Sequence, residues 1–269
     1  MSTAADRVTA FRRLHESGIF VMPNPWDVGS ARALEQLGFP ALATTSAGMA
    51  WTLGKADTEV GLDDVLRHLE TIAGAVAVPV HADFEDGYAV DPRLVYQNTG
   101  RAVATGISGL SIEDSTRGEP DPLHSLELSI ERVQAARQAI DDSGTGVVLT
   151  ARSEGFVVGR PDIDETVRRL RAYADAGADC LYAPRLTTAE QITAVVEAVA
   201  PKPVNLLING PFMTVAAAAS LGVRRISVGG TLARAAWGGF LAAAHEIAEQ
   251  GTFGAFHDLP DVDGLFSGL

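Results

Sequence analysis

Short apolar runs rich in β-branched residues alternate along the chain with segments whose apolar residues recur every three or four positions. The first pattern predicts buried strands, and the second predicts amphipathic helices. Predicted strands cover residues 19–22, 41–45, 78–83, 110–113, 147–152, 180–183, 204–208 and 225–228. Helical segments at 30–37, 62–75, 94–105, 126–143, 164–176, 188–200 and 211–221 lie between them. These units predict an α/β fold, a single (β/α)8 TIM-type barrel.

A doubly wound open sheet is the alternative architecture. No G-x-G-x-x-G motif follows the first predicted strand, which argues against the dinucleotide-binding version of that sheet. No proline- or serine-rich linker marks a domain boundary either. We therefore expect one barrel with a C-terminal helical segment over residues 1–257, followed by a C-terminal tail at 258–269.

Composition and charge narrow the possible partners. The chain of 269 residues is 46% apolar and has a net charge of −13, which argues against a nucleic-acid partner. An anionic substrate remains compatible, because a metal ion and a few arginines can reverse the local field. Cys180 is the single cysteine, so we expect no internal disulfide and a cytoplasmic location. No apolar run approaches 18 residues, so we expect no membrane-spanning segment.

The third predicted strand ends in a group of acids. If the strand alternation continues, His81, Asp83 and Glu85 share one face. Two neighbouring carboxylates repel each other, and a cation removes that cost. Mg²⁺ commonly takes one carboxylate directly and another through a water molecule. The stretch therefore indicates a metal site, with a surface acidic turn as the alternative.

Polar residues also follow the other predicted strands, at the carboxyl ends where a barrel carries its active site. Acids and arginines at such positions must pair or bind a ligand if they are buried. Glu154 can neutralise Arg152, and Asp114, on the opposite face from Glu113, favours a structural pairing. The set comprises Asn24, Asp27, Ser46, Asp57, Glu113, Asp114, Arg152, Glu154, Arg185 and Asn209.

Six motifs in this order resemble the isocitrate lyase/phosphoenolpyruvate mutase superfamily, specifically its phosphonomutase-like branch. The resemblance extends from about Phe11 to about His257. The motifs are Asn-Pro-Trp-Asp at 24–27, Thr-Ser-Ala-Gly at 45–48, Gly-Lys-Ala-Asp at 54–57, Ala-Asp-Phe-Glu-Asp-Gly-Tyr at 82–88, Ser-Ile-Glu-Asp at 111–114 and Ala-Arg-Ser-Glu at 151–154.

The resemblance implies a Mg²⁺-dependent barrel, with Mn²⁺ as the alternative metal, that acts on small 2-oxo or enol acids. It implies that Asp83, Glu85 and Glu113 form the metal site. It also implies that Ser46, Ala47 and Gly48 hold a substrate carboxylate, while Arg152 pairs with a carboxylate or phosphoryl group. Asp57 corresponds to an acid near the migrating group of the mutases, and Tyr88 corresponds to a residue that lines the site.

The chain also departs from the family. It has no Lys-Lys-Cys-Gly-His loop, which argues against a typical isocitrate or methylisocitrate lyase. The predicted gating loop at 115–122 lacks the lysine and the Asn-Ser pair of the mutases. Arg117 is the candidate to replace that lysine as a substrate contact, since a guanidinium suits a pair of carboxylate or phosphonate oxygens. Asn209 is a further candidate substrate contact, or a residue that only shapes the Asn-Gly turn.

Three functions follow in order of preference. The first is a Mg²⁺-dependent lyase that cleaves a C–C bond of a small 2-oxo or 2-hydroxy di- or tricarboxylic acid through a pyruvate-like enolate. The second is a P–C bond phosphonomutase acting on a carboxyphosphonate- or phosphonopyruvate-like compound, and the third is a non-catalytic ligand-binding barrel. The predicted catalytic residues are Asp57, Glu113, Arg152 and Tyr88.

The proton donor stays open among Asp57, Glu154, Tyr88 and His81, and His81 is equally compatible with a packed core position. The expected partners are a small anionic carboxylate substrate and further copies of the chain. The resemblance implies a homodimer or homotetramer in which subunits exchange their last helix.

Overall fold

Eight strands of the described residues follow the apolar runs, each two to five residues long and mostly buried. The computed structural model describes residues 3–116 and 120–267. The strands are β1 (Phe20–Met22), β2 (Leu42–Ala43), β3 (Val80–Ala82), β4 (Gly109–Glu113), β5 (Val148–Arg152), β6 (Cys180–Tyr182), β7 (Val204–Leu207) and β8 (Arg225–Ser227). All of them pair in parallel, as expected for strands joined by helical crossovers.

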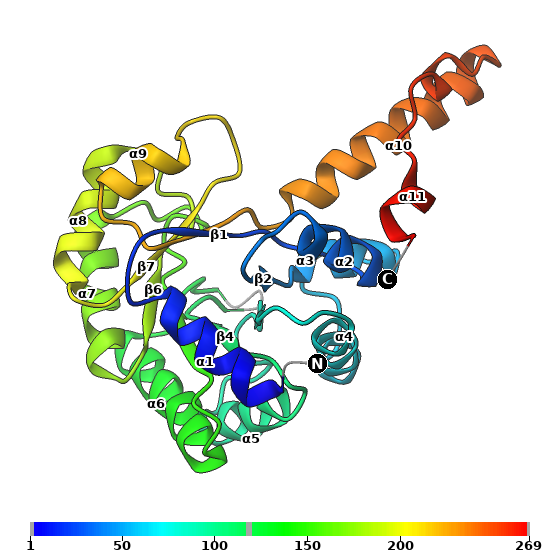
Figure 1. Cartoon of the computed structure of the whole chain (residues 1–269). Helices are drawn as coiled ribbons and strands as arrows, with labels where there is room; N and C mark the ends of the chain where they lie inside the picture. Colours follow the sequence, from blue (N-terminus) through cyan, green and yellow to red (C-terminus); the bar gives the residue numbers. More distant parts are fainter. Residues whose placement is uncertain (1–2, 117–119, 268–269) are drawn as a thin grey trace.

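Helices lie between the strands and at both ends of the chain, and those between the strands cover the outside of the sheet (Figure 1). They are α1 (Ala4–Leu14), α2 (Val28–Gln36), α3 (Ser46–Thr52), α4 (Leu62–Ala75), α5 (Pro92–Val103), α6 (Leu126–Ser143), α7 (Ile163–Asp175), α8 (Ala189–Val199), α9 (Val215–Ser220), α10 (Thr231–Gln250), the 3₁₀ helix η1 (Gly254–Phe256) and α11 (Val262–Phe266). Side chains cap most helix starts; Asp27, for example, accepts from the Ser30 amide.

The sheet curls into a nearly closed barrel. Strand pairing runs in the order β1-β8-β7-β6-β5-β4-β3-β2. Asn24 links the two edge strands, because its amide donates to the Thr44 carbonyl while its oxygen accepts from the Val228 and Gly229 amides. The Ala43 amide also donates to the Pro23 carbonyl. These contacts confirm the predicted (β/α)8 barrel and give the Asn-Pro-Trp-Asp motif a structural role.

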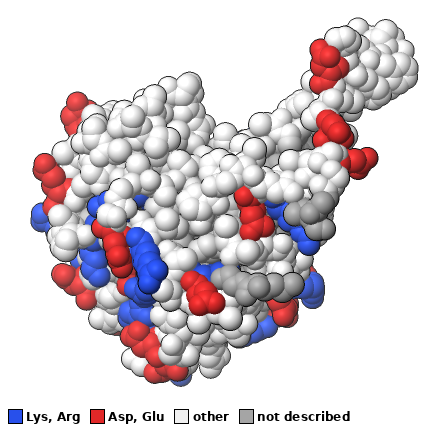
Figure 2. All heavy atoms as spheres, viewed as in Figure 1, with Lys and Arg blue, Asp and Glu red and all other residues white. Residues whose placement is uncertain are grey.

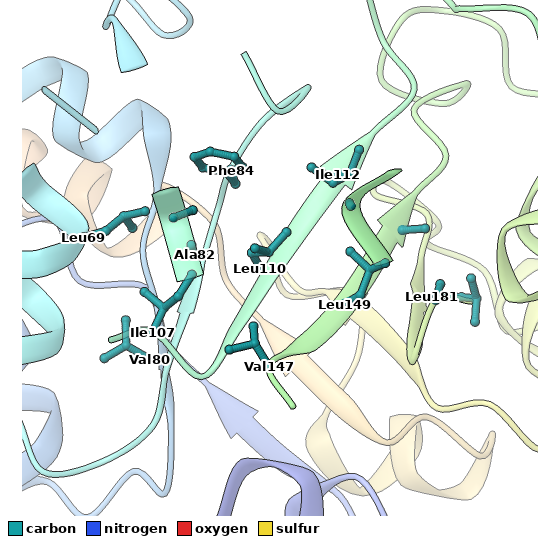
Figure 3. Packing of buried hydrophobic residues seen from close by; sticks show 14 of the residues in the cluster. Leu69, Val80, Ala82, Phe84, Ile107, Leu110, Ile112, Val147, Leu149 and Leu181 are labelled. Atoms are coloured by element: carbon teal, nitrogen blue, oxygen red, sulfur yellow. The ribbon is translucent and has the colours of Figure 1, made fainter. Parts of the chain in front are cut away.

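Because side chains alternate along each strand, the buried residues form two layers, one between the strands and the helices and one inside the barrel. Val80, Leu110, Ile112 and Leu149 face the helices, and Figure 3 shows them beside one another in the outer layer. A smaller apolar cluster fills the amino-terminal end of the barrel interior, where Phe11 of α1 packs among strand residues. The residues above this cluster, such as Ser111 and Glu113 on β4, are therefore turned into the upper half of the barrel.

The structure differs from the predicted elements in a few places. Helices α1 and α3 were not predicted, and α9 covers less than the predicted 211–221 because the Pro211 end is a turn and Thr214 caps the helix. The segment expected as a tail contains α11. Helix α10 extends away from the barrel instead of packing on it (Figure 1). Along residues 3–116 and 120–267, no helix is both long and apolar enough to cross a membrane.

Candidate active site

A cavity of about 270 Å³ lies at the carboxyl ends of the strands. Residues that follow the strands surround its mouth, among them Ser46, Asp57, Arg185 and Asn209. All eight strands contribute a lining side chain: Met22, Ala43, His81, Ser111, Arg152, Tyr182, Asn205 and Ser227. The cavity thus occupies the position at which barrels carry their active sites.

Four charged side chains converge in this region, and we call them the Arg152 cluster: Asp83, Glu113, Arg152 and Glu154. Arg152 Nη1 lies 2.7 Å from Asp83 Oδ1 and 3.0 Å from Glu113 Oε2. Arg152 Nε donates to Glu154 Oε1 at 2.9 Å. The exposed fractions of the four side chains are 20%, 13%, 15% and 3%, so the cluster is largely withdrawn from water.

One guanidinium faces three carboxyl groups, and burial decides their protonation. Burial raises the pKa of Glu154 to about 8, against the pull of Arg152 and with the help of Glu113. Burial also raises the pKa of Glu113, although Arg152 opposes the shift. At neutral pH the cluster therefore holds a largely protonated carboxylic acid beside an ion pair, the arrangement that general acid catalysis requires.

The first residue of α3 forms a hydrogen bond with Asp83 of the Arg152 cluster. The Ser46 amide donates to Asp83 Oδ2 at 3.1 Å, and the Gly48 amide donates to Thr45 Oγ1 at 3.3 Å. The Gly48 amide, one of the groups predicted to hold a substrate carboxylate, thus already has an intramolecular acceptor, while Ser46 and Ala47 line the cavity. These residues form the first turn of α3, which the Thr45 side chain caps.

Asp57 lies at the rim of the cavity, which Ser46 also lines. Partial removal from water, together with the negative charge of Asp83, raises its pKa. The structure therefore brings Asp57 next to the Arg152 cluster, and its role near a reacting group stays a prediction.

Glu85 and Tyr88, in contrast, lie outside the cavity. Strand β3 ends at Ala82, and Glu85 and Tyr88 adopt positive φ angles of 45° and 57° in the turn that follows. The prediction that strand alternation continues from Asp83 to Glu85 was therefore wrong. The Tyr88 hydroxyl donates to Glu85 Oε1 at 2.6 Å, and neither residue lines the cavity. Their roles in metal binding and catalysis stay predictions.

Asp114 is structural, as its strand face suggested. Its carboxylate accepts from the Tyr173 hydroxyl at 2.6 Å, from Arg169 Nη1 at 3.2 Å and from the Glu154 amide at 2.8 Å. The network is buried and fixes the backbone that carries Glu154.

Asp114→Asn should lower the free energy of unfolding by about 2 kcal/mol, because the buried Arg169 loses one of its two charged partners and keeps only Glu165. Urea unfolding followed by circular dichroism measures this loss. Asp142→Asn, which changes an exposed acid bonded to Tyr96, is the matched control and should change stability by less than about 0.5 kcal/mol. Equal stability of the two variants would contradict the structural role of Asp114.

Arg225 was missed by the sequence analysis. It is 1% exposed, lies at the deep end of the cavity and donates to Asn205 Oδ1 and Thr150 Oγ1. The available signal was a cation at the start of an apolar strand, two residues before Ser227 and on the same face.

Of the predicted substrate contacts, Asn209 lies at the cavity mouth, and Arg117 lies outside the described residues.

Comparison with known proteins identifies a family whose members resemble this chain along most of its length. The model of the phosphoenolpyruvate phosphomutase family matches residues 11–248, which is most of the chain and includes the Arg152 cluster. The chain belongs to this family. The match confirms the predicted membership of the isocitrate lyase/phosphoenolpyruvate mutase superfamily.

Relatives of the phosphoenolpyruvate phosphomutase family include lyases as well as mutases. An oxaloacetate decarboxylase of Bradyrhizobium sp. (strain ORS 278) is 30% identical over 200 residues, covering 71% of this chain and 68% of that protein. A solved structure from Burkholderia cenocepacia J2315 superimposes with a TM-score of 0.93 and 44% identity, over 97% of this chain and 95% of that one. A 2,3-dimethylmalate lyase structure gives 0.86 and 29%, over 99% and 94%.

Members of the phosphoenolpyruvate phosphomutase superfamily generally use Mg²⁺, so the donor set was tested against that ion. Within the described parts of the chain, no three His, Cys, Asp or Glu side chains gather as ligands around one point. Asp83 and Glu113 nevertheless direct oxygens at the same cationic nitrogen of Arg152. Mg²⁺ usually takes one or two carboxylates and keeps several waters. Asp83 and Glu113 can therefore supply the carboxylates that such an ion takes, provided that Arg152 Nη1 leaves the point on which their oxygens converge.

Proposed function

We propose that the protein is a Mg²⁺-dependent lyase that cleaves a C–C bond of a small 2-oxo or 2-hydroxy di- or tricarboxylic acid. The convergence of Asp83 and Glu113 on Arg152, with Asp83 and Arg152 lining one cavity, is the observation that carries this proposal. Asp83 and Glu113 would hold the metal, which when bound supplies the Lewis acidity that stabilises a developing enolate. The lyase relatives and the departures of the chain from the mutase motifs support C–C over P–C chemistry.

Arg152 is the proposed substrate-carboxylate contact. Its Nε and Nη1 atoms bond to the acids of the cluster, whereas Nη2 has no hydrogen-bond partner among residues 3–116 and 120–267. The Tyr182 ring lies 5.1 Å from the guanidinium carbon and limits its movement. Arg152 thus presents a fixed N–H edge to the cavity, which suits a planar carboxylate.

Glu154 is the proposed proton donor. Its raised pKa keeps it largely protonated at neutral pH, and its side chain lines the cavity beside Arg152. A carboxylic acid in this position can deliver a proton to the carbanion that remains after C–C cleavage. Asp57, whose pKa is also raised, is the alternative donor at the rim.

The proposal predicts a change in activity near pH 8. Above this value Glu154 ionises, so kcat should fall because the donor is lost, and KM should rise because negative charge is added beside Arg152. Steady-state kinetics from about pH 6 to 9 measures both effects. Glu154→Gln should lose the inflection in KM, whereas Glu165→Gln, on α7, should keep it. An inflection that survives in Glu154→Gln would exclude Glu154 as the titrating group.

Nuclear magnetic resonance distinguishes the proposed reaction from its alternatives. The protein is incubated with Mg²⁺ and oxaloacetate, alkylated malates, phosphoenolpyruvate and phosphonopyruvate, and proton and phosphorus spectra are followed. Mg²⁺-dependent release of an oxo acid from a carboxylate substrate supports the lyase. A phosphorus signal that moves between the P–O and P–C regions instead identifies a phosphonomutase. A protein that converts none of these compounds would contradict the proposal.

We also propose that α10 and the segment after it pack against a second copy of the chain. Figure 1 shows this arm projecting from the barrel, and Figure 2 shows a mostly uncharged surface along it. Large apolar side chains are exposed on the arm, which is unusual for a monomer. They include Trp237, Phe240, Leu241, Ile247, Phe253 and Phe256. A partner with the same apolar arm would bury them reciprocally.

Phe240→Asp should convert the assembled protein into monomers, since a carboxylate would be buried at the contact. Light scattering coupled to size-exclusion chromatography measures the mass. Leu37→Asp changes an equally exposed residue of the barrel, 71% exposed against 60% for Phe240, and should leave the mass unchanged. A wild-type mass near 28.2 kDa would contradict the proposed assembly.

A further inference from the structure

Arg225 is a buried cation without a buried anion. Its guanidinium donates to three neutral acceptors: Asn205 Oδ1 at 2.8 Å, Thr150 Oγ1 at 3.0 Å and His15 Nε2 at 3.2 Å. No carboxylate in the described parts of the chain forms an ion pair with it. Arg152, which lines the same cavity, differs from Arg225 because it contacts three acids.

The surroundings of Arg225 supply no hidden negative charge. His15 Nδ1 lies 2.7 Å from the Phe11 carbonyl, so Nδ1 carries the proton and Nε2 is the acceptor for Arg225. Asp179, the acid that acts on His15, is engaged by Arg12 and Arg137 instead. Leaving a buried guanidinium unpaired is costly, so the position is prepared for an anion.

Arg225 is accessible from only one side. Phe11 and His15 of the N-terminal region close the barrel below it, and the guanidinium belongs to the wall of the cavity above. Three hydrogen bonds use three of its five N–H groups, which leaves two for a ligand. His81 and Asn205 line the same deep end and add only neutral polar groups.

The spacing between Arg225 and Arg152 along the cavity suits the two charged ends of one small substrate. Arg225 bonds to Thr150, two residues before Arg152 on the same face of β5 and about 6.6 Å farther toward the amino end of the strand. A dicarboxylic acid with a short carbon chain spans such a step. One carboxylate would then face Arg152 and the other would face Arg225.

We infer that the deep end of the cavity is a second carboxylate subsite, built on Arg225, which would hold the carboxylate of the substrate that does not face Arg152. This inference rests on the proposed function, because it assigns the second charged end of that lyase's substrate. A charge-assisted hydrogen bond in a buried site should favour the dicarboxylate over its monocarboxylate analogue by about 10- to 100-fold in affinity.

Calorimetric titration with malate and lactate tests the subsite, since both are 2-hydroxy acids and only malate has a second carboxylate. With Mg²⁺ present, the wild type should bind malate about 10- to 100-fold more tightly than lactate. Arg225→Met should reduce this ratio to within about twofold, and Arg225→Lys, which keeps the charge, should preserve most of it. Circular dichroism confirms that each variant is folded, and the lysine variant keeps the test valid if the methionine variant is not.

The outcomes separate this inference from the proposed function. A malate-to-lactate ratio that is unchanged in Arg225→Met, or wild-type protein that does not bind malate, overturns the subsite even if the protein converts another acid. A ratio that collapses in Arg225→Met without turnover of any carboxylate supports the subsite and counts against the proposed reaction.

Discussion

Asp83→Ala is expected to lower kcat/KM by about 10³-fold, which corresponds to about 4 kcal/mol of transition-state stabilisation. Asp83 links the proposed metal site to the proposed substrate contacts. It contacts Arg152 at 2.7 Å, accepts from the Ser46 amide at 3.1 Å and is one of the two proposed metal ligands. Its loss would remove a negative charge at the point where metal and substrate meet.

Steady-state kinetics with the substrate identified by magnetic resonance measures this effect. Asp83→Asn keeps the shape of the side chain and should be nearly as inactive, because the charge and not the volume is required. Asp64→Ala removes an exposed acid on α4 and should leave kcat/KM unchanged. Wild-type activity in Asp83→Ala would show that the reaction takes place elsewhere.

Arg152→Met should affect both activity and stability. Three carboxyl groups would lose the guanidinium that neutralises them, and breaking such a buried arrangement costs about 3–5 kcal/mol. Activity should fall by at least about 10³-fold, because the substrate carboxylate loses its partner. Arg152→Lys should recover part of the stability and little of the activity, since an ammonium cannot reproduce the three contacts of the planar fork.

The stability loss of Arg152→Met should depend on pH in a defined direction. Burial already raises the pKa values of Glu113 and Glu154 in the folded protein, and removing Arg152 raises them further. An acid whose pKa is higher in the folded state stabilises the fold while it is protonated and loses that contribution as pH rises. The variant should thus be closest to wild type at low pH and weakest above pH 8. Equal losses at pH 5 and pH 9 would contradict this electrostatic origin.

The sequence predicted the barrel because alternating strands and amphipathic helices are local patterns. It also placed Asp83, Glu113, Arg152 and Glu154 near one another, because parallel strands deliver their carboxyl ends to the same edge. That reasoning depends on regular strand geometry. It holds for β4 and β5, where Glu113 and Arg152 pair in register.

The same reasoning fails where the backbone leaves the strand. Glu85 enters a turn with positive φ, which no alternation rule describes. Gly48 belongs to a short helix whose cap depends on the Thr45 side chain. Arg225 was overlooked because its significance comes from missing counter-charges, and the absence of an ion pair is visible only once the distant neighbours are assembled.

Titration of Mg²⁺ into the protein by calorimetry tests the central claim most directly, namely that Asp83 and Glu113 form one divalent-cation site beside Arg152. The wild type should bind one Mg²⁺ per chain. Asp83→Ala should abolish this binding, and Asp64→Ala should retain it. A wild type that binds no Mg²⁺, or an Asp83→Ala variant that binds it as tightly as the wild type, would contradict the account.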